Sequence, residues 1–260
     1  MLNFMKKWLF VLLFLVTSYL ARTQTLHLLL VSDYADINFG MVSIADEEMV
    51  NQMFRKIASR IDYQFLTHYV NKTQPKGFTN EAVMDMLKTP TQPNDIFIFY
   101  FSGLGSYSNR RLYPNLNLDK SLSLDRVASV LQAKGLKLGL VLADCRNQFT
   151  DHFPIAGLGQ RGTIVQDDQS KKITKKLFLE NDCRVVKVAS ARRAADFLSY
   201  KNNSVFSYSL TETYEDFLYV ANLEEVSLDN FIREIEATTK AFIPTYEGLR
   251  DESVKCKVRR

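Results

Sequence analysis

The sequence predicts an α/β fold, a three-layer α/β/α sandwich built around a mostly parallel sheet. Short, fully apolar runs of strand length alternate along the chain with segments in which apolar residues recur at helical spacing. The strand-like runs are apolar on both faces, which is typical of strands in a parallel sheet covered by helices on each side. No repeat or Pro/Gly-rich linker interrupts residues 24–245, so we expect one domain.

The elements follow one another in a regular order. Strands are predicted at residues 26–31, 63–70, 96–101, 138–142 and 184–189. Helices are predicted at residues 44–61, 79–88, 123–134, 171–180, 205–218 and 228–238. Thr79 and Ser123 are suitable N-caps for two of these helices, and Gly135 is a suitable C-terminal stop.

The N-terminus has the pattern of a secretory signal peptide. Lys6 and Lys7 precede a run of nine apolar residues at 8–16, and small residues follow at Ala21 and Thr23. A retained membrane anchor is the alternative, but the run is short for a helix that must cross ~30 Å of hydrocarbon. We therefore expect a secreted or periplasmic protein with no stable membrane insertion after cleavage. Three segments are expected: a signal peptide at 1–23, a domain at 24–245 and a charged C-terminal tail at 246–260.

Charge and motifs argue against several classes of ligand. Removal of residues 1–23 takes away three basic residues and lowers the formal charge from +4 to +1. No basic stripe with interleaved aromatic residues is present, so no nucleic-acid partner is expected. Neither a Walker motif nor a dinucleotide fingerprint occurs, and we expect no cofactor.

Histidine and cysteine are sparse. The three histidines, at positions 27, 68 and 152, show no metal-ligand spacing with one another or with cysteine, so no metal site is expected. The three cysteines are Cys145, Cys183 and Cys256, which allow one disulfide at most. The fold is therefore expected not to depend on disulfides.

Two segments at predicted strand ends stand out as the candidate site. In this architecture ligands bind at the carboxyl ends of the strands. Residues 101–107 carry Gly103 and Gly105 on either side of Leu104, and we expect these glycines to allow a sharp turn that presents residue 104 above the sheet. Residues 143–148 carry Cys145 in a polar setting at the end of a buried strand.

These two segments resemble motifs of the caspase-like superfamily of cysteine peptidases. Residues 99–105, Phe-Tyr-Phe-Ser-Gly-Leu-Gly, are similar to the Tyr-Ser-Gly-His-Gly strand end that carries the family's catalytic histidine. Residues 139–147, Gly-Leu-Val-Leu-Ala-Asp-Cys-Arg-Asn, are similar to the strand end that carries its catalytic cysteine. The order of elements resembles the family over residues 27–240. The resemblance implies a caspase-like sheet and cysteine endopeptidase ancestry.

The resemblance also implies that the catalytic pair is broken. Leu104 occupies the family's histidine position and cannot transfer a proton. Two alignments of the second motif stay open: one makes Cys145 the nucleophile, and the other places Arg146 at the nucleophile position. A basic-preferring substrate pocket would use Asp33, Asp144 and Ser190, although Asp33 could equally serve only to cap its loop.

Three functions remain in competition. The first is an exported pseudopeptidase that binds peptide or protein partners without cleaving them, and the absence of the histidine favours it. The second is a weakly active cysteine endopeptidase that uses Cys145 and prefers basic residues. The third is a structural component whose site is vestigial.

Overall fold

The computed structural model describes a large part of the domain and little of the two termini. The residues described are 23–34, 40–71, 73, 76–106, 113–146, 167–181, 185–190, 199–200, 203–219, 222–242 and 249–250. The signal-peptide residues 1–22 and most of the C-terminal tail lie outside these ranges. Both boundaries therefore stay predictions.

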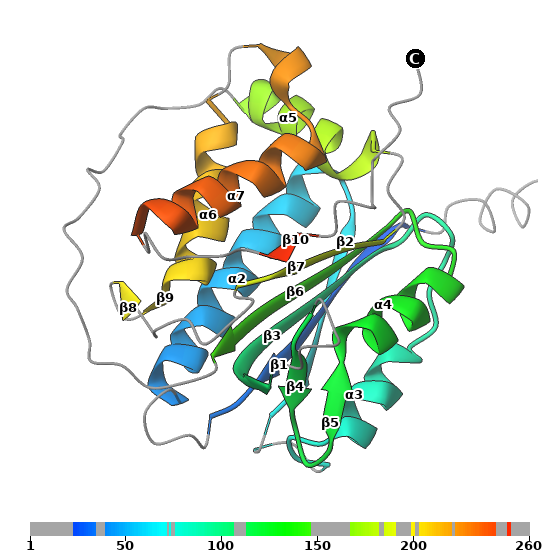
Figure 1. Cartoon of the computed structure of the whole chain (residues 1–260). Helices are drawn as coiled ribbons and strands as arrows, with labels where there is room; N and C mark the ends of the chain where they lie inside the picture. Colours follow the sequence, from blue (N-terminus) through cyan, green and yellow to red (C-terminus); the bar gives the residue numbers. More distant parts are fainter. Residues whose placement is uncertain are drawn as a thin grey trace, which may run out of the picture.

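A mostly parallel sheet forms the middle of the molecule (Figure 1). Its strand order is β10-β7-β6-β3-β1-β2. These strands are β1 (Thr25–Ser32), β2 (Gln64–Val70), β3 (Ile96–Ser106), β6 (Leu138–Arg146), β7 (Val185–Ala189) and β10 (Leu249–Arg250). All neighbours are parallel except β10, which runs antiparallel to β7.

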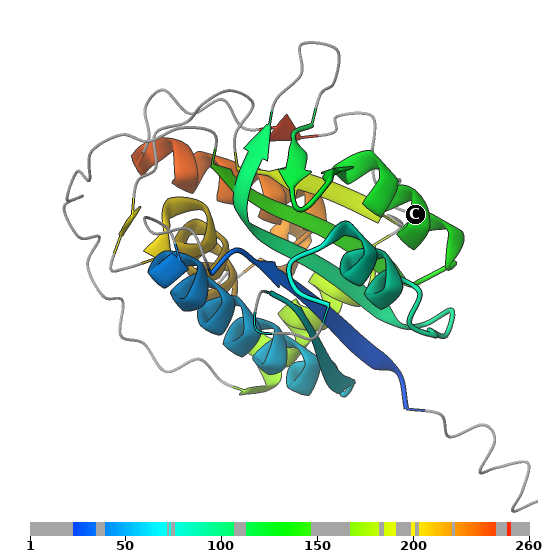
Figure 2. The ribbon, with the colours of Figure 1, turned by 90° about the horizontal axis from the view of Figure 1, so that it is seen from below.

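Helices cover both faces of the sheet, as Figures 1 and 2 show, so the predicted three-layer α/β/α arrangement is confirmed. One face, here called the α2 face, packs against α2 (Gly40–Arg60), α5 (Asp167–Leu179), α6 (Val205–Phe217) and α7 (Leu228–Phe242). The other, the α3 face, packs against α3 (Asn80–Leu87) and α4 (Leu124–Ala133). The shorter elements are β4 (Asn115–Asn117), β5 (Ser121–Ser123), β8 (Ser199–Tyr200), β9 (Asn203–Ser204) and the 3-10 helix η1 (Leu223–Glu225).

Alternation along the strands divides the core in two. In β3, Ile98 and Tyr100 lie in the apolar cluster of the α2 face, whereas Phe97, Phe99 and Phe101 lie in that of the α3 face. The same parity holds across β1 and β6, because these strands pair with β3 in register. Residue parity therefore decides which face a side chain joins.

Helix termini follow the local signals in the sequence. The Thr79 hydroxyl accepts a hydrogen bond from the Ala82 N–H, and the Ser123 hydroxyl accepts one from the Arg126 N–H, as expected of N-caps. Gly135, just after α4, has a φ of +66°, which is the left-handed conformation that favours glycine after a helix. These three predictions are confirmed.

Two central strands are longer than predicted, and this corrects the expected form of the site. β3 continues to Ser106 and β6 to Arg146, so much of the two predicted loops is paired strand. Gly103 and Gly105 are not among the glycines with positive φ, and the expected sharp turn at Leu104 is wrong. Beyond their predicted ends the two strands go on pairing with each other in parallel register, as far as Leu104 and Arg146.

Among the helices that the structure describes, none combines the length and apolar character needed to cross a membrane.

Candidate functional site

The predicted site residues come from four neighbouring strands at their carboxyl ends. Asp33 directly follows β1, Leu104 lies in β3, and Asp144 and Cys145 lie in β6. Ser190 directly follows β7. The register pairs Gly103 with Cys145 and Leu104 with Arg146. The backbone thus gathers these positions at one edge of the sheet.

The two glycines of β3 are required by close approach rather than by a turn. A Cβ atom on Gly105 would lie 2.9 Å from the Cβ and 3.0 Å from the Sγ of Cys145. A Cβ atom on Gly103 would lie 3.0 Å from the Phe101 ring and 3.2 Å from the Cβ of Asp33. Larger residues at these two positions would collide with their neighbours, so the Gly-x-Gly pattern serves packing.

Cys145 belongs to the apolar interior of the α3 face. Its side chain is 3% exposed and joins the cluster that contains Phe101 and Leu116. Its Sγ faces Gly105, which also lies on this side of the strand. These contacts are those of a buried core cysteine.

Ser190 binds the backbone of Cys145 at two points. The Cys145 N–H donates to the Ser190 Oγ at 2.9 Å, and the same hydroxyl donates to the Cys145 carbonyl oxygen at 3.1 Å. The Ser190 N–H also donates to the carbonyl oxygen of Ala143 at 2.8 Å. The predicted substrate-binding hydroxyl is therefore engaged in joining β6 to the end of β7.

Leu104 lies on the opposite side of the sheet from the Cys145 sulfur. It is half-buried and packs against Val42, near the start of α2. The side chains of Leu104 and Cys145 therefore point to different faces. Arg146 is the register partner of Leu104, and its side chain lies outside the described part of the chain.

The acids of the predicted substrate pocket are also separated by the sheet. Asp144 is buried on the α2 face, where its Oδ2 accepts a hydrogen bond from the Ser207 hydroxyl of α6 at 3.2 Å. Asp33 donates its backbone N–H to the Ser102 carbonyl oxygen at 3.0 Å, and its Cβ lies beside Gly103 on the α3 face. The structure does not bring Asp33 and Asp144 into one pocket.

A buried polar network on the α2 face was not anticipated from the residues. Asp46 of α2 is fully buried, and its Oδ1 accepts the Ser204 N–H at 2.8 Å and the Asn203 side-chain amide at 3.4 Å. The Ser102 hydroxyl lies 3.2 Å from the Ser43 Oγ and 3.4 Å from the Asp46 Oδ2. This network joins β3, α2 and the start of α6 on the α2 face, which is also the face on which Leu104 packs.

Glu47, the next residue of α2, is a second buried acid. Burial raises the pKa of its carboxyl group, and hydrogen bonds from Tyr34 and Ser32 partly oppose that rise. Among the residues that the structure describes, its buried Oε2 has no close hydrogen-bond partner. Acidic residues of a helix ordinarily face solvent. The signal in the sequence for the burial of Asp46 and Glu47 was their position between apolar residues that recur at helical spacing.

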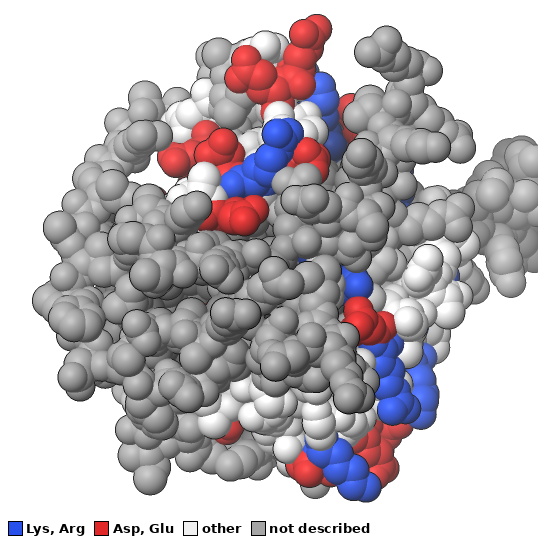
Figure 3. All heavy atoms as spheres, in the orientation of Figure 1, with Lys and Arg blue, Asp and Glu red and all other residues white. Residues whose placement is uncertain are grey.

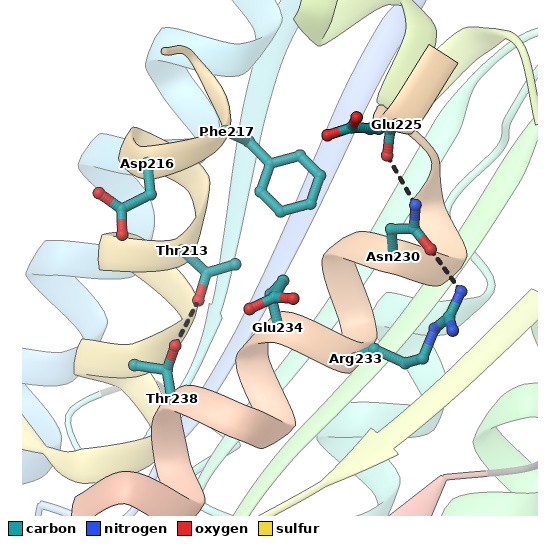
Figure 4. A pocket seen from close by; sticks show the side chains of 8 residues that line it. All are labelled: Thr213, Asp216, Phe217, Glu225, Asn230, Arg233, Glu234 and Thr238. Atoms are coloured by element: carbon teal, nitrogen blue, oxygen red, sulfur yellow. Dashed lines mark hydrogen bonds between the residues drawn. The ribbon is translucent and has the colours of Figure 1, made fainter. Parts of the chain in front are cut away.

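A cavity of about 430 Å³ lies elsewhere, in the outer helical layer between α6, η1 and α7 (Figure 4). Its lining residues are Thr213, Asp216, Phe217, Glu225, Asn230, Arg233, Glu234 and Thr238. None of the predicted site residues lines it. Figure 3 shows acidic and basic side chains close together over this part of the helical layer.

Within the described ranges, no group of three or more His, Cys, Asp or Glu side chains has an arrangement that could hold a metal ion.

Comparison with known proteins finds likeness among solved structures alone. No family model matches the sequence, and no curated protein matches it. The crystal structure of protein GSU0716 from Geobacter sulfurreducens is similar over 90% of this chain and 97% of that chain, with 14% sequence identity and a TM-score of 0.48. A likeness at this level carries no inference about family or activity.

Proposed function

We propose that this chain is an exported caspase-like domain protein that lacks peptidase activity and binds a peptide or protein partner at the carboxyl edge of its sheet. The observation that carries the proposal is the placement of Leu104 and Cys145 on opposite faces of the sheet. The proposal rests also on the resemblance of residues 99–105 and 139–147 to the two motifs of that superfamily.

The chemistry of the two positions argues against catalysis. A cysteine acts as a nucleophile in its thiolate form, and a neighbouring base or cation is needed to generate that form at neutral pH. The base must lie within about 3 Å of the proton that it removes. Leu104 has no proton-accepting atom, and Cys145 is packed among apolar side chains on the other face. A pair in this arrangement has no route to the proton transfer that peptide hydrolysis requires.

An exposed apolar patch supports partner binding. Met41 and Ile44, in the first turns of α2, are 82% and 45% exposed. They flank Val42, the residue against which Leu104 packs. Because large apolar side chains exposed together mark interaction surfaces, this patch beside the carboxyl edge is the expected binding surface.

The first experiment tests for peptidase activity. The purified mature protein is incubated with fluorogenic peptides that end in Arg, Lys or Asp before the scissile bond, and the Cys145→Ala variant is assayed beside it. We expect no turnover from either protein. Turnover by the wild type that the Cys145→Ala change abolishes would overturn the proposal.

The second experiment tests for binding. The mature protein is used to select binders from a displayed random-peptide library, and the selected peptides are then measured against variants by calorimetry. Binding is expected to weaken in the Met41→Ser/Ile44→Ser variant and to persist in Leu223→Ser, which removes an exposed apolar side chain from η1. Equal affinity in all three proteins would place the binding surface elsewhere.

A further inference from the structure

Three ionisable side chains form a buried chain far from the site described above. His27 of β1 and Asp95, which precedes β3, are 4% and 2% exposed, and His68 of β2 is half-buried. His27 and His68 share the α3 face, because Leu29 is the register partner of His68 and has the same parity as His27. His27 and Asp95 lie toward the amino ends of β1 and β3, and His68 lies in β2 opposite Leu29.

The two imidazole rings meet edge to edge. The His27 Nδ1 lies 3.4 Å from the His68 Nε2, the ring planes differ by 8°, and the ring centroids are 5.7 Å apart. The centroid separation exceeds the nitrogen–nitrogen distance by about two ring radii, so the rings lie nearly in one plane. An N–H of one ring therefore points at the lone pair of the other.

The carboxylate at the other end fixes the proton positions. The Asp95 Oδ2 lies 3.4 Å from the His27 Nε2, and the two carboxylate oxygens also accept the N–H groups of Thr25 and Gln92. A carboxylate only accepts hydrogen bonds, so the His27 Nε2 carries the proton and the His27 Nδ1 is the acceptor. The His68 Nε2 must then be the donor, which leaves the His68 Nδ1 as the nitrogen that can take up a further proton.

We propose that Asp95, His27 and His68 form a proton-sensitive latch on the edge strand β2, which keeps both hydrogen bonds when it takes up one proton and opens when it takes up a second. The first proton binds to the His68 Nδ1 and leaves the chain of hydrogen bonds unchanged. The second makes both rings imidazolium, with two N–H groups facing each other across 3.4 Å. The hydrogen bond between the rings is then replaced by repulsion.

The surroundings set the pH range in which the latch operates. Burial lowers the pKa of His27, Asp95 opposes this shift, and the Lys134 ammonium at the end of α4 adds to it. Burial and the neighbouring His27 lower the pKa of His68. Tyr63, before β2, is a further ionisable group near Asp95, and burial and Asp95 raise its pKa. Both histidines of the latch are therefore uncharged near neutral pH, and they take up protons under acid conditions.

The position of His68 gives the latch its effect. Within the described residues, β2 pairs only with β1 and ends the sheet. The contact from His68 to His27 adds a side-chain attachment to the backbone ladder of this edge strand. Opening the latch is expected to weaken β2 before the central strands.

Proton-detected NMR of the imidazole nitrogens tests the proposed proton positions in the whole mature chain. At neutral pH both His27 and His68 are expected to carry their proton on Nε2, and their titrations are expected to be coupled, with two separated steps. A proton on the Nδ1 of His27, or two independent titrations near the ordinary value of about 6.5, would overturn the proposal.

Thermal unfolding of variants tests the latch itself. Gln at position 68 can donate to the His27 Nδ1 or, turned over, accept from it, but cannot become charged. On acidification from about pH 7.5 to about pH 5, His68→Gln is expected to lose less melting temperature than the wild type, and His152→Gln, a control, as much as the wild type. His68→Phe, which has no hydrogen bond to offer, is expected to melt lower than the wild type at about pH 7.5, where the latch is closed. Equal acid sensitivity in wild type and His68→Gln would contradict the latch.

Discussion

Leu104 and Cys145 lie on neighbouring strands one register step apart, and their side chains point to opposite faces of the sheet. Gly103, not Leu104, is the register partner of Cys145. Successive side chains of a strand alternate between the two faces, so a single step separates a core position on the α3 face from a position that packs on α2. The separation is thus a property of the backbone register.

The register predicts which substitutions can restore a catalytic pair. Leu104→His alone is expected to give no peptidase activity, because the Cys145 sulfur stays on the other face. Leu104→His combined with Arg146→Cys places the histidine and a cysteine at partner positions of β3 and β6. Turnover of fluorogenic peptides is the measurement, and activity of the single variant that depends on Cys145 would contradict the assignment.

Gly105 is expected to tolerate no side chain. Gly105→Ala puts a methyl group 2.9 Å from the Cys145 Cβ, and we expect the free energy of unfolding to fall by about 1–3 kcal/mol through overpacking. Chemical denaturation measures the change. In the Cys145→Gly background, where those side-chain atoms are gone, the same substitution is expected to cost less. An equal cost in both backgrounds would place the strain elsewhere.

The buried Asp46 is expected to stabilise the junction of α2 with the start of α6. Asp46→Ala removes the acceptor of the Ser204 N–H, which leaves a buried donor unsatisfied and is expected to cost about 1–3 kcal/mol of unfolding free energy. Glu48→Ala, at an exposed position of the same helix, is the matched control and is expected to have little effect. Similar losses in the two variants would rule out a specific role for Asp46.

Glu47 is expected to destabilise the fold near neutral pH. Because burial raises its pKa in the folded state above the unfolded value of about 4.5, the native state binds more protons and stability falls as pH rises from that value through the folded pKa. Glu47→Gln is therefore expected to raise the melting temperature at neutral pH and to leave it unchanged well below pH ~4. A lower melting temperature at neutral pH would show that the charged carboxylate is favourable.

The sequence predicts the layers and the local helix signals well, because these depend on short-range patterns. Apolar runs mark the central strands β1, β3 and β6, and Thr79 and Ser123 form the caps that their residue types indicate. The ends of β3 and β6 are different. Glycine is unfavourable in isolated strands, and Gly103 is held extended by its pairing with β6, whereas Gly105 is held by its pairing with β4.

The candidate site could be located from sequence but not assembled. The residues singled out do lie at one edge of the sheet, as parallel topology requires. Which face each side chain joins depends on whether its strand continues as far as that residue, because successive side chains of a strand point to opposite faces of the sheet. The burial of Asp46 and Glu47 depends on α6 and the end of β1 packing against α2, which no local pattern records.

The paired hydrogen bonds between Ser190 and Cys145 have a consequence for the shape of this edge. β7 ends at Ala189 whereas β6 continues, and one hydroxyl group offers β6 both the acceptor and the donor that another peptide unit would have offered. The Ser190 side chain thus extends the hydrogen bonding between β6 and β7 beyond the last residue of β7. β6 thereby keeps hydrogen-bond partners on its β7 side at Cys145, beyond the last register pair of the two strands, which is Ala143 with Ala189.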